Sequence, residues 1–250
     1  MKCSAIVTGG TGGLGSAVVR RLLDDGWRVV VPWVVEQELE RVQEQLDDSG
    51  AAHSGEAGGR AGRWHERLEL IQADLFDPES VEQVVSAAAT GDGVPLRGLV
   101  NLVGGFAAGG RVHETPIEEF EQQFRMNLRA TYLMTQAAVP PMLEGDGGAI
   151  VCVGTRAAVQ PFSGAAGYIA SKAAVTAFAQ AVAVEYRNDG IRCNAILPSV
   201  IDTPANRASM PNADHDRWVK PEAIAGVIAQ LLSPDSEPVS GAAIPVYGRA

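Results

Sequence analysis

Short apolar runs alternate with longer segments of helical periodicity along the whole chain. The runs predict strands near Cys3–Thr8, Arg28–Val34, Leu68–Ala73, Leu99–Val103, Ala149–Val153, Ile191–Leu197 and Ala243–Val246. Helical periodicity fills most gaps, at Leu14–Asp24, Glu36–Leu46, Pro78–Ala88, Ile117–Leu143, Gly167–Tyr186 and Pro221–Leu232. Runs that are apolar throughout are typical of strands buried on both faces. The alternation therefore predicts an α/β fold: a doubly wound parallel sheet of about seven strands with helices on both faces.

The 250 residues are expected to form one domain, because no internal repeat and no long linker divides them. A hydrophobic content of 46% is enough for one sizeable core. Residues 49–63 are rich in Gly and Ala and carry no motif, which predicts a mobile surface loop.

The composition excludes several classes of function. A formal net charge of −10 argues against nucleic acid or an anionic membrane as a partner. Cys3, Cys152 and Cys193 each lie in an apolar run and are expected to be buried thiols of a reducing cytoplasm. The four histidines are scattered without ligand spacing, so no metal site is predicted. The first residues do not resemble a signal peptide, and a cytoplasmic location is expected.

A glycine-rich turn, TGGTGGLG, joins the first predicted strand to the first predicted helix. Gly9, Gly13 and Gly15 would allow a tight turn, close approach of the backbone to a phosphate, and close packing of the helix on the strand. The free amides at the start of the helix would point at a pyrophosphate. This placement favours nucleotide binding over a turn that is only structural.

Tyr168 and Lys172 lie four residues apart in the predicted helix GYIASKAAVTAFAQAVAVEYR, so they share one helix face. An ammonium group within a few ångströms would lower the pKa of the phenol. A tyrosine with a lowered pKa can exchange a proton with a substrate oxygen near neutral pH. A pair of this kind found alone would be an ordinary surface tyrosine and lysine.

Together with further motifs, these features resemble the short-chain dehydrogenase/reductase family over nearly the whole chain. The further motifs are QADLFD around Asp74, NLVG from Asn101, FRMNLRATYLM around Asn127, and PSVIDT from Pro198. The resemblance implies a single NAD(P)-binding Rossmann-like domain. It also implies an NAD(P)-dependent oxidoreductase that transfers hydride between nicotinamide C4 and a small carbonyl or alcohol substrate, and a homodimer or homotetramer.

The resemblance also implies roles for individual residues. Tyr168 would be the general acid or base, Lys172 would lower its pKa and bind the nicotinamide ribose, and Asn127 would connect Lys172 to solvent protons. Thr155 stands where the family usually has a serine that holds the substrate oxygen. It keeps the hydroxyl donor, although it could also simply end a strand. The expected cofactor-binding residues are Thr8, Gly9, Thr11, Gly13, Leu14, Gly15, Trp33, Asp74, Leu75, Asn101, Val103, Gly104, Tyr168, Lys172, Pro198, Val200 and Thr203.

The choice between NAD and NADP stays open in the sequence. Trp33 stands where the family has an Asp for the NAD ribose, and an indole can only donate a hydrogen bond. Residues 32–35 and the glycine turn contain no base for a 2′-phosphate, and Arg41 lies further along. Trp33 could stack on the adenine or belong to the core.

The substrate also stays open. GGFAAGG at Gly104–Gly110, WVVEQELE at Trp33–Glu40 and DTPANRASMPNADHDRW at Asp202–Trp218 resemble dihydropteridine reductases, which favours a pterin-like substrate as an alternative. The pocket is expected beyond the carboxyl ends of the strands, with residues 198–218 as a lid. Phe106, Phe162, Met210 and Trp218 are candidates to stack on a flat substrate. A second alternative is a dinucleotide-sensing protein without catalysis.

Overall fold

The computed structural model describes residues 3–39, 64 and 66–249. The expected loop at 49–63, Arg41, and the second half of the helix expected at 36–46 lie outside the described residues.

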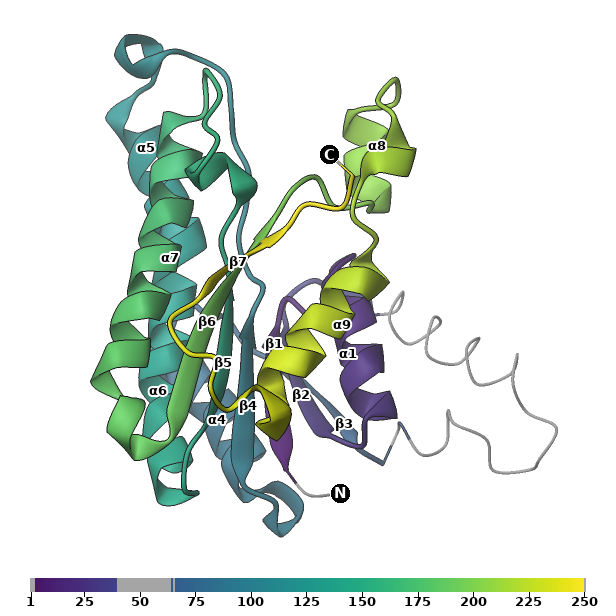
Figure 1. Cartoon of the computed structure of the whole chain (residues 1–250), viewed down its shortest axis with the longest axis vertical. Helices are drawn as coiled ribbons and strands as arrows, with labels where there is room; N and C mark the ends of the chain where they lie inside the picture. The colour runs from purple at the N-terminus through teal and green to yellow at the C-terminus, as the bar shows by residue number, and fades with distance from the viewer. Residues whose placement is uncertain (1–2, 40–63, 65, 250) are drawn as a thin grey trace, which may run out of the picture.

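A seven-stranded parallel sheet forms the centre of the molecule (Figure 1), in the strand order β3-β2-β1-β4-β5-β6-β7. The bounds are β1 Ser4–Thr8, β2 Arg28–Trp33, β3 Leu68–Gln72, β4 Leu96–Asn101, β5 Gly148–Val153, β6 Ile191–Pro198 and β7 Ala243–Val246. All seven expected strands are present. The chain adds β2 and β3 on one side of β1 and then returns to place β4 on its other side. Ligands of open α/β sheets bind at such a reversal, beyond the carboxyl ends of the strands.

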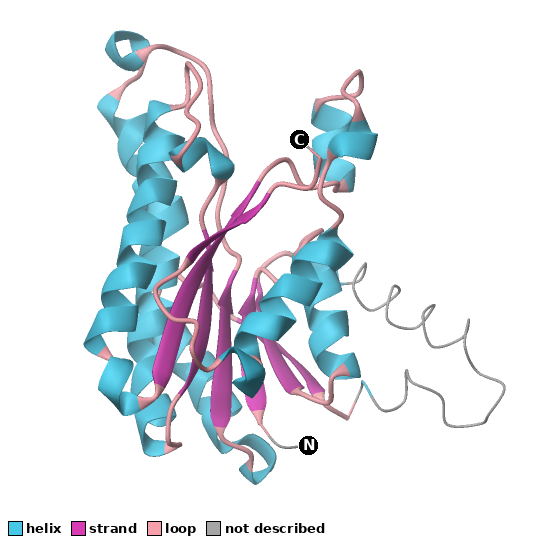
Figure 2. Cartoon of the chain, in the orientation of Figure 1, coloured by secondary structure: helices cyan, strands magenta, loops and turns pink. Residues whose placement is uncertain are grey.

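Helices cover both faces of the sheet (Figure 2). They are α1 Gly15–Asp24, α4 Pro78–Thr90, α5 Ile117–Phe124, α6 Ala130–Glu144, α7 Ala166–Glu185, α8 Pro204–Ser209 and α9 Pro221–Leu232. One core lies between the sheet and α4, α6 and α7, and the other lies between the sheet and α1 and α9. The apolar strands therefore bury side chains on both faces, as their composition predicts. Cys152 and Cys193 are buried, whereas Cys3 is half-buried.

The long helix expected at 117–143 is not regular. It consists of α5 and α6 joined by a π-helical turn, Arg125–Arg129. The periodicity of apolar residues does not distinguish a regular α-helix from an α-helix that contains one π-helical turn. Such turns are frequent at functional sites. The turn contains Asn127, one of the expected site residues.

Helix α8 was not expected from the sequence. Pro204 occupies its first turn, and the Thr203 hydroxyl caps its start by accepting a hydrogen bond from the Asn206 amide. The helix lies within the segment expected as a lid. In Figure 1 it stands apart from the upper ends of α5 and α7. The base of the segment is held by a bridge between Ile201 and Val219.

Candidate functional site

The glycine turn after β1 is shaped by contacts that leave no room for side chains. Gly9 has a φ of 64° and its carbonyl accepts a hydrogen bond from Gly12 at 3.0 Å. A Cβ on Gly15 would lie 2.6 Å from the Gly10 Cα and would also collide with the Gly9 carbonyl. Because α1 begins at Gly15, its first amides face the space beyond the turn. The backbone amides of the turn and of the start of α1 can therefore bind a phosphate without interference from side chains.

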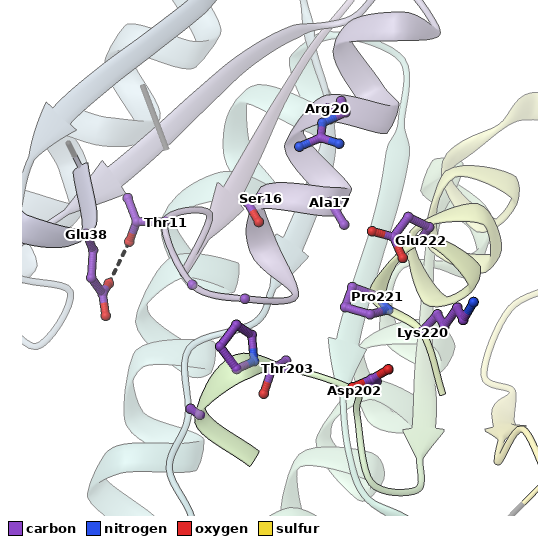
Figure 3. Close-up of a pocket in the computed structure, with 14 residues that line it drawn as sticks. Thr11, Ser16, Ala17, Arg20, Glu38, Asp202, Thr203, Lys220, Pro221 and Glu222 are labelled. Carbon is purple, nitrogen blue, oxygen red and sulfur yellow. Dashed lines mark hydrogen bonds between the residues drawn. The ribbon is translucent and has the colours of Figure 1, made fainter. Parts of the chain in front are cut away.

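A cavity of about 550 Å³ opens beside this turn (Figure 3). Thr11, Gly12 and Gly13 line one wall, and Thr203 lies opposite, where its Cγ2 is 3.0 Å from the position of a Cβ on Gly13. Thr203 is one of the cofactor-binding residues expected from the sequence, and the structure places it against the glycine turn. A cavity with a backbone cradle on one side and a threonine on the other fits the diphosphate of a dinucleotide.

Thr8 joins the turn to the neighbouring strand. Its hydroxyl accepts hydrogen bonds from the amides of Leu102 and Val103, at 3.0 and 3.3 Å. It also donates to the Val100 carbonyl at 3.4 Å. The end of β4 is thereby fixed beside the glycine turn, which brings Val103 and Gly104 to the crevice between β1 and β4.

Thr155, Tyr168 and Lys172 meet beyond the end of β5. Thr155 caps the 3₁₀ turn Arg156–Ala158, because its hydroxyl accepts a hydrogen bond from the Ala157 amide at 3.3 Å. The same hydroxyl lies close enough to the Tyr168 phenol to act on the pKa of that phenol. Lys172 lies one turn further along α7, and its ammonium donates to the Val153 carbonyl at 2.9 Å. Two elements distant in sequence thus place a phenol, a hydroxyl and an ammonium at one strand end.

The pKa values in this group correct one expectation from the sequence. Burial raises the pKa of Tyr168, and the Thr155 hydroxyl acts in the opposite direction. Lys172 was expected to lower the pKa of the phenol, but it is not among the groups that shift it. Burial also lowers the pKa of Lys172 to about 8, while the nearby Cys152 acts to raise it. Removal from water is the largest cause of the pKa shift of both Tyr168 and Lys172.

Asn127 connects α7 to the loop after β4. Its side-chain oxygen accepts a hydrogen bond from the Gly105 amide at 2.9 Å, and its amide group donates to Ser171 at 3.0 Å. Ser171 in turn donates to the Tyr168 carbonyl at 2.8 Å. A Cβ on Gly104 would lie 2.6 Å from the Asn127 oxygen and 2.8 Å from the Lys172 nitrogen. Asn127 and Lys172 therefore approach the same point above Gly104, where only a glycine fits.

Aromatic rings flank the phenol. The Phe106 ring packs edge-on against Tyr168, with ring centres 5.0 Å apart, and its centre lies 6.4 Å from that of Phe162. Phe106 is 64% exposed, so most of this ring faces outward. The structure brings these two stacking candidates to the phenol. Trp218 instead packs against His215 within the expected lid, with ring centres 4.4 Å apart.

Other expected site residues lie at strand ends but have different surroundings. Asn101 is buried at the end of β4 and donates to Thr135 and to Cys152, so its side chain points into the core and not into the crevice. Asp74 is exposed after β3, and its carboxylate accepts a hydrogen bond from the Phe76 amide. The remaining expected cofactor residues are the buried Leu75 after β3, Pro198 at the end of β6 and Val200 just beyond it.

Glu38 is a residue of the cavity that the sequence analysis missed. It lies on the cavity wall and accepts a hydrogen bond from the Thr11 hydroxyl at 2.9 Å (Figure 3). Trp33 ends β2 and does not line this cavity. The available signal was an acid about 20 residues beyond the glycine turn, which is typical of ribose binding.

Comparison with known proteins agrees with this geometry. Residues 4–214 match the short chain dehydrogenase family. The chain belongs to this family. It is 31% identical to 2-(R)-hydroxypropyl-CoM dehydrogenase of Xanthobacter autotrophicus, over 98% of this chain and 96% of that protein. It is therefore an oxidoreductase that uses a nicotinamide cofactor, NAD or NADP.

Solved structures support the same assignment. A blue fluorescent protein from a metagenomic library, solved in complex with NADPH, superposes with a TM-score of 0.81 and 31% identity, over 98% of this chain and 96% of that one. A short-chain type dehydrogenase/reductase from Mycobacterium ulcerans superposes with a TM-score of 0.86 and 24% identity, over 100% of this chain and 90% of that one. The second likeness concerns the fold alone.

Proposed function

We propose that this protein transfers hydride between nicotinamide C4 and a small carbonyl or alcohol, with Tyr168 as the general acid or base. The observation that carries the proposal is the gathering of the Tyr168 phenol, the Thr155 hydroxyl and the buried Lys172 at the end of β5. When bound, the cofactor supplies or takes up the hydride. The protein must then add or remove one proton at the substrate oxygen.

Thr155 and Tyr168 divide that task. The Thr155 oxygen already accepts a hydrogen bond from the Ala157 amide, so its single proton is available to the phenol or to a substrate oxygen. Tyr168 exchanges the proton with the substrate. Lys172, one turn along α7 and anchored on the Val153 carbonyl, is placed to bind the nicotinamide ribose.

Asn127 acts as a positioning residue in this proposal. Its side chain bonds both the Gly105 amide and Ser171, and Ser171 bonds the carbonyl of Tyr168. The loop that carries Phe106 and the helix that carries the phenol are thereby held at a fixed separation. Such fixed geometry is what a proton transfer between two oxygens requires.

The aromatic wall supports a pterin-like substrate as the alternative. Phe106 packs against Tyr168 and Phe162 packs against Phe106, and both rings are largely exposed, which suits a flat heterocycle. Turnover of a quinonoid dihydropterin that exceeds turnover of simple ketones would favour this alternative.

Replacing Tyr168 with Phe tests the proposal. The variant loses only the hydroxyl, so kcat should fall by about 100-fold or more while cofactor affinity stays within about twofold of wild type. Stopped-flow hydride transfer and a nicotinamide fluorescence titration measure the two quantities separately. An unchanged kcat would refute the role of Tyr168. A protein that binds cofactor but turns over no member of a carbonyl, alcohol and pterin panel would be a dinucleotide sensor.

The proposal includes a homodimer or homotetramer. Helix α7 consists mostly of apolar residues, yet less than half of it is buried within one chain. By length and composition alone it could cross a membrane, but it packs here against β5, β6 and α5. A second copy of the chain that covers the outer face of α7 accounts for its apolar composition and for its partial burial within one chain.

A further inference from the structure

The geometry points to Glu38 as the residue that makes this protein select NAD over NADP. The inference rests on the proposed function, since it concerns the cofactor of the same site. It assigns the acid that recognises the ribose to a residue in the first turn after β2, and not to the strand end where Trp33 stands.

The contact between Glu38 and the glycine turn is the first support. Residues 36–39 are helical, and this turn carries Glu38 to the cavity wall. The Thr11 hydroxyl donates to Glu38 Oε2 at 2.9 Å, which leaves Oε1 and further lone pairs as acceptors. In Figure 3 the carboxylate lies beside Thr11 at the edge of the cavity. The carboxylate is therefore held in place before a ligand arrives.

Charge is the second support. A carboxylate accepts hydrogen bonds from the two hydroxyls of an adenosine ribose, whereas a 2′-phosphate brings about −1.5 to −2 charges to the same place. A 2′-phosphate would need an Arg or Lys nearby. Within the part of the chain that the structure describes, the glycine turn at 8–15 and residues 29–39 contain neither. Arg28 starts β2 at its other end and pairs with Glu69.

The cations of the cavity lie elsewhere. Arg20 and Lys220 line it together with Asp202 and Glu222. Figure 3 shows these four on the opposite side of the glycine turn from Glu38. A phosphate placed beside Glu38 and Thr11 would therefore lie on the side of the turn away from these cations.

A relative that shares the architecture at 31% identity was solved in complex with NADPH. The opposite selection inferred for this chain therefore depends on the few side chains around the ribose and not on the shared fold. In this chain the fixed side chain at that place is an acid.

Titration of the purified full-length chain with NADH and with NADPH tests the inference. Nicotinamide fluorescence should give a Kd for NADH at least about tenfold below that for NADPH, because the acid repels the extra phosphate. Glu38→Gln should remove most of this preference by tightening NADPH binding, and Glu38→Arg should reverse it. Glu36→Gln is the matched control: it removes the same charge from an exposed neighbour and should leave both Kd values unchanged.

The outcomes separate this inference from the proposed function. If NADPH binds as tightly as NADH, or if Glu38→Gln leaves the ratio of the two Kd values unchanged, the inference is wrong and the oxidoreductase proposal stands. If neither cofactor binds, both fail. Both readouts are binding measurements and need no substrate.

Discussion

Lys172 is a charged side chain that the fold has taken almost fully out of water, with 7% of its surface exposed. Its position one turn from Tyr168, on the same helix face, could be predicted from the sequence. The direction of the pKa shifts could not, because burial depends on how α7 packs on the sheet. The spacing predicts which two side chains lie together, and the packing sets the direction in which their pKa values shift.

The lowered pKa of Lys172 predicts a pH dependence of stability. Between its folded pKa of about 8 and the unfolded value of 10.5, the unfolded chain binds more protons. Burial of the ammonium therefore costs free energy below pH 8, and this cost is relieved as the pH rises toward 10.5. Relative to Lys172→Met, the wild type should gain about 2 to 3 kcal/mol of unfolding free energy between pH 7 and pH 10. Urea unfolding of both proteins measures this difference, and a gap independent of pH would contradict it.

At the scale of elements, the glycine turn and α1 behave as one unit. The sequence predicted the strand, the turn and the helix, because glycines at this spacing allow a tight turn and close packing of the helix on the strand. It did not predict that Glu38 would join the turn, since that contact depends on a short helical turn after β2. Nor did it predict α8, whose start depends on Thr203 and Pro204 within a segment that looks irregular.

Gly15→Ala tests the packing of α1 on the turn. The new methyl would collide with the backbone of Gly9 and Gly10. We expect a loss of about 1 to 3 kcal/mol of unfolding free energy, and weaker binding of either cofactor. Gly109→Ala is the control, since a methyl there meets nothing within 4 Å. Thermal melts and fluorescence titration check both variants, and equal behaviour of the two would refute the steric account.

At the scale of the molecule, the exposed apolar surface of α6 and α7 bears on assembly. Tyr132 on α6 is 47% exposed and packs on Phe178 of α7, with ring centres 5.8 Å apart. Val184, also on α7, is 65% exposed. The overall fold followed from alternation of strands and helices, but whether a second copy covers this surface cannot be derived from one chain.

Light scattering tests the proposed assembly. We expect a dimer or tetramer at micromolar concentration, and Tyr132→Glu should shift it toward the monomer by placing a charge in the contact. Val112→Glu, a similar change at an exposed position in the 3₁₀ turn Val112–Glu114, is the control and should leave the mass unchanged. A wild type that is monomeric at this concentration would remove the proposal.

Because α5 and α6 are joined by the π-helical turn Arg125–Arg129, the position of Asn127 depends on the number of residues in that turn as well as on their identity. One residue fewer would restore a regular helix and rotate everything on one side of the change by about 100°. Asn127 would then lose its hydrogen bonds to Gly105 and Ser171, although the residue itself would be unchanged. Across its relatives, this segment should thus tolerate exchange of side chains far better than gain or loss of a single position.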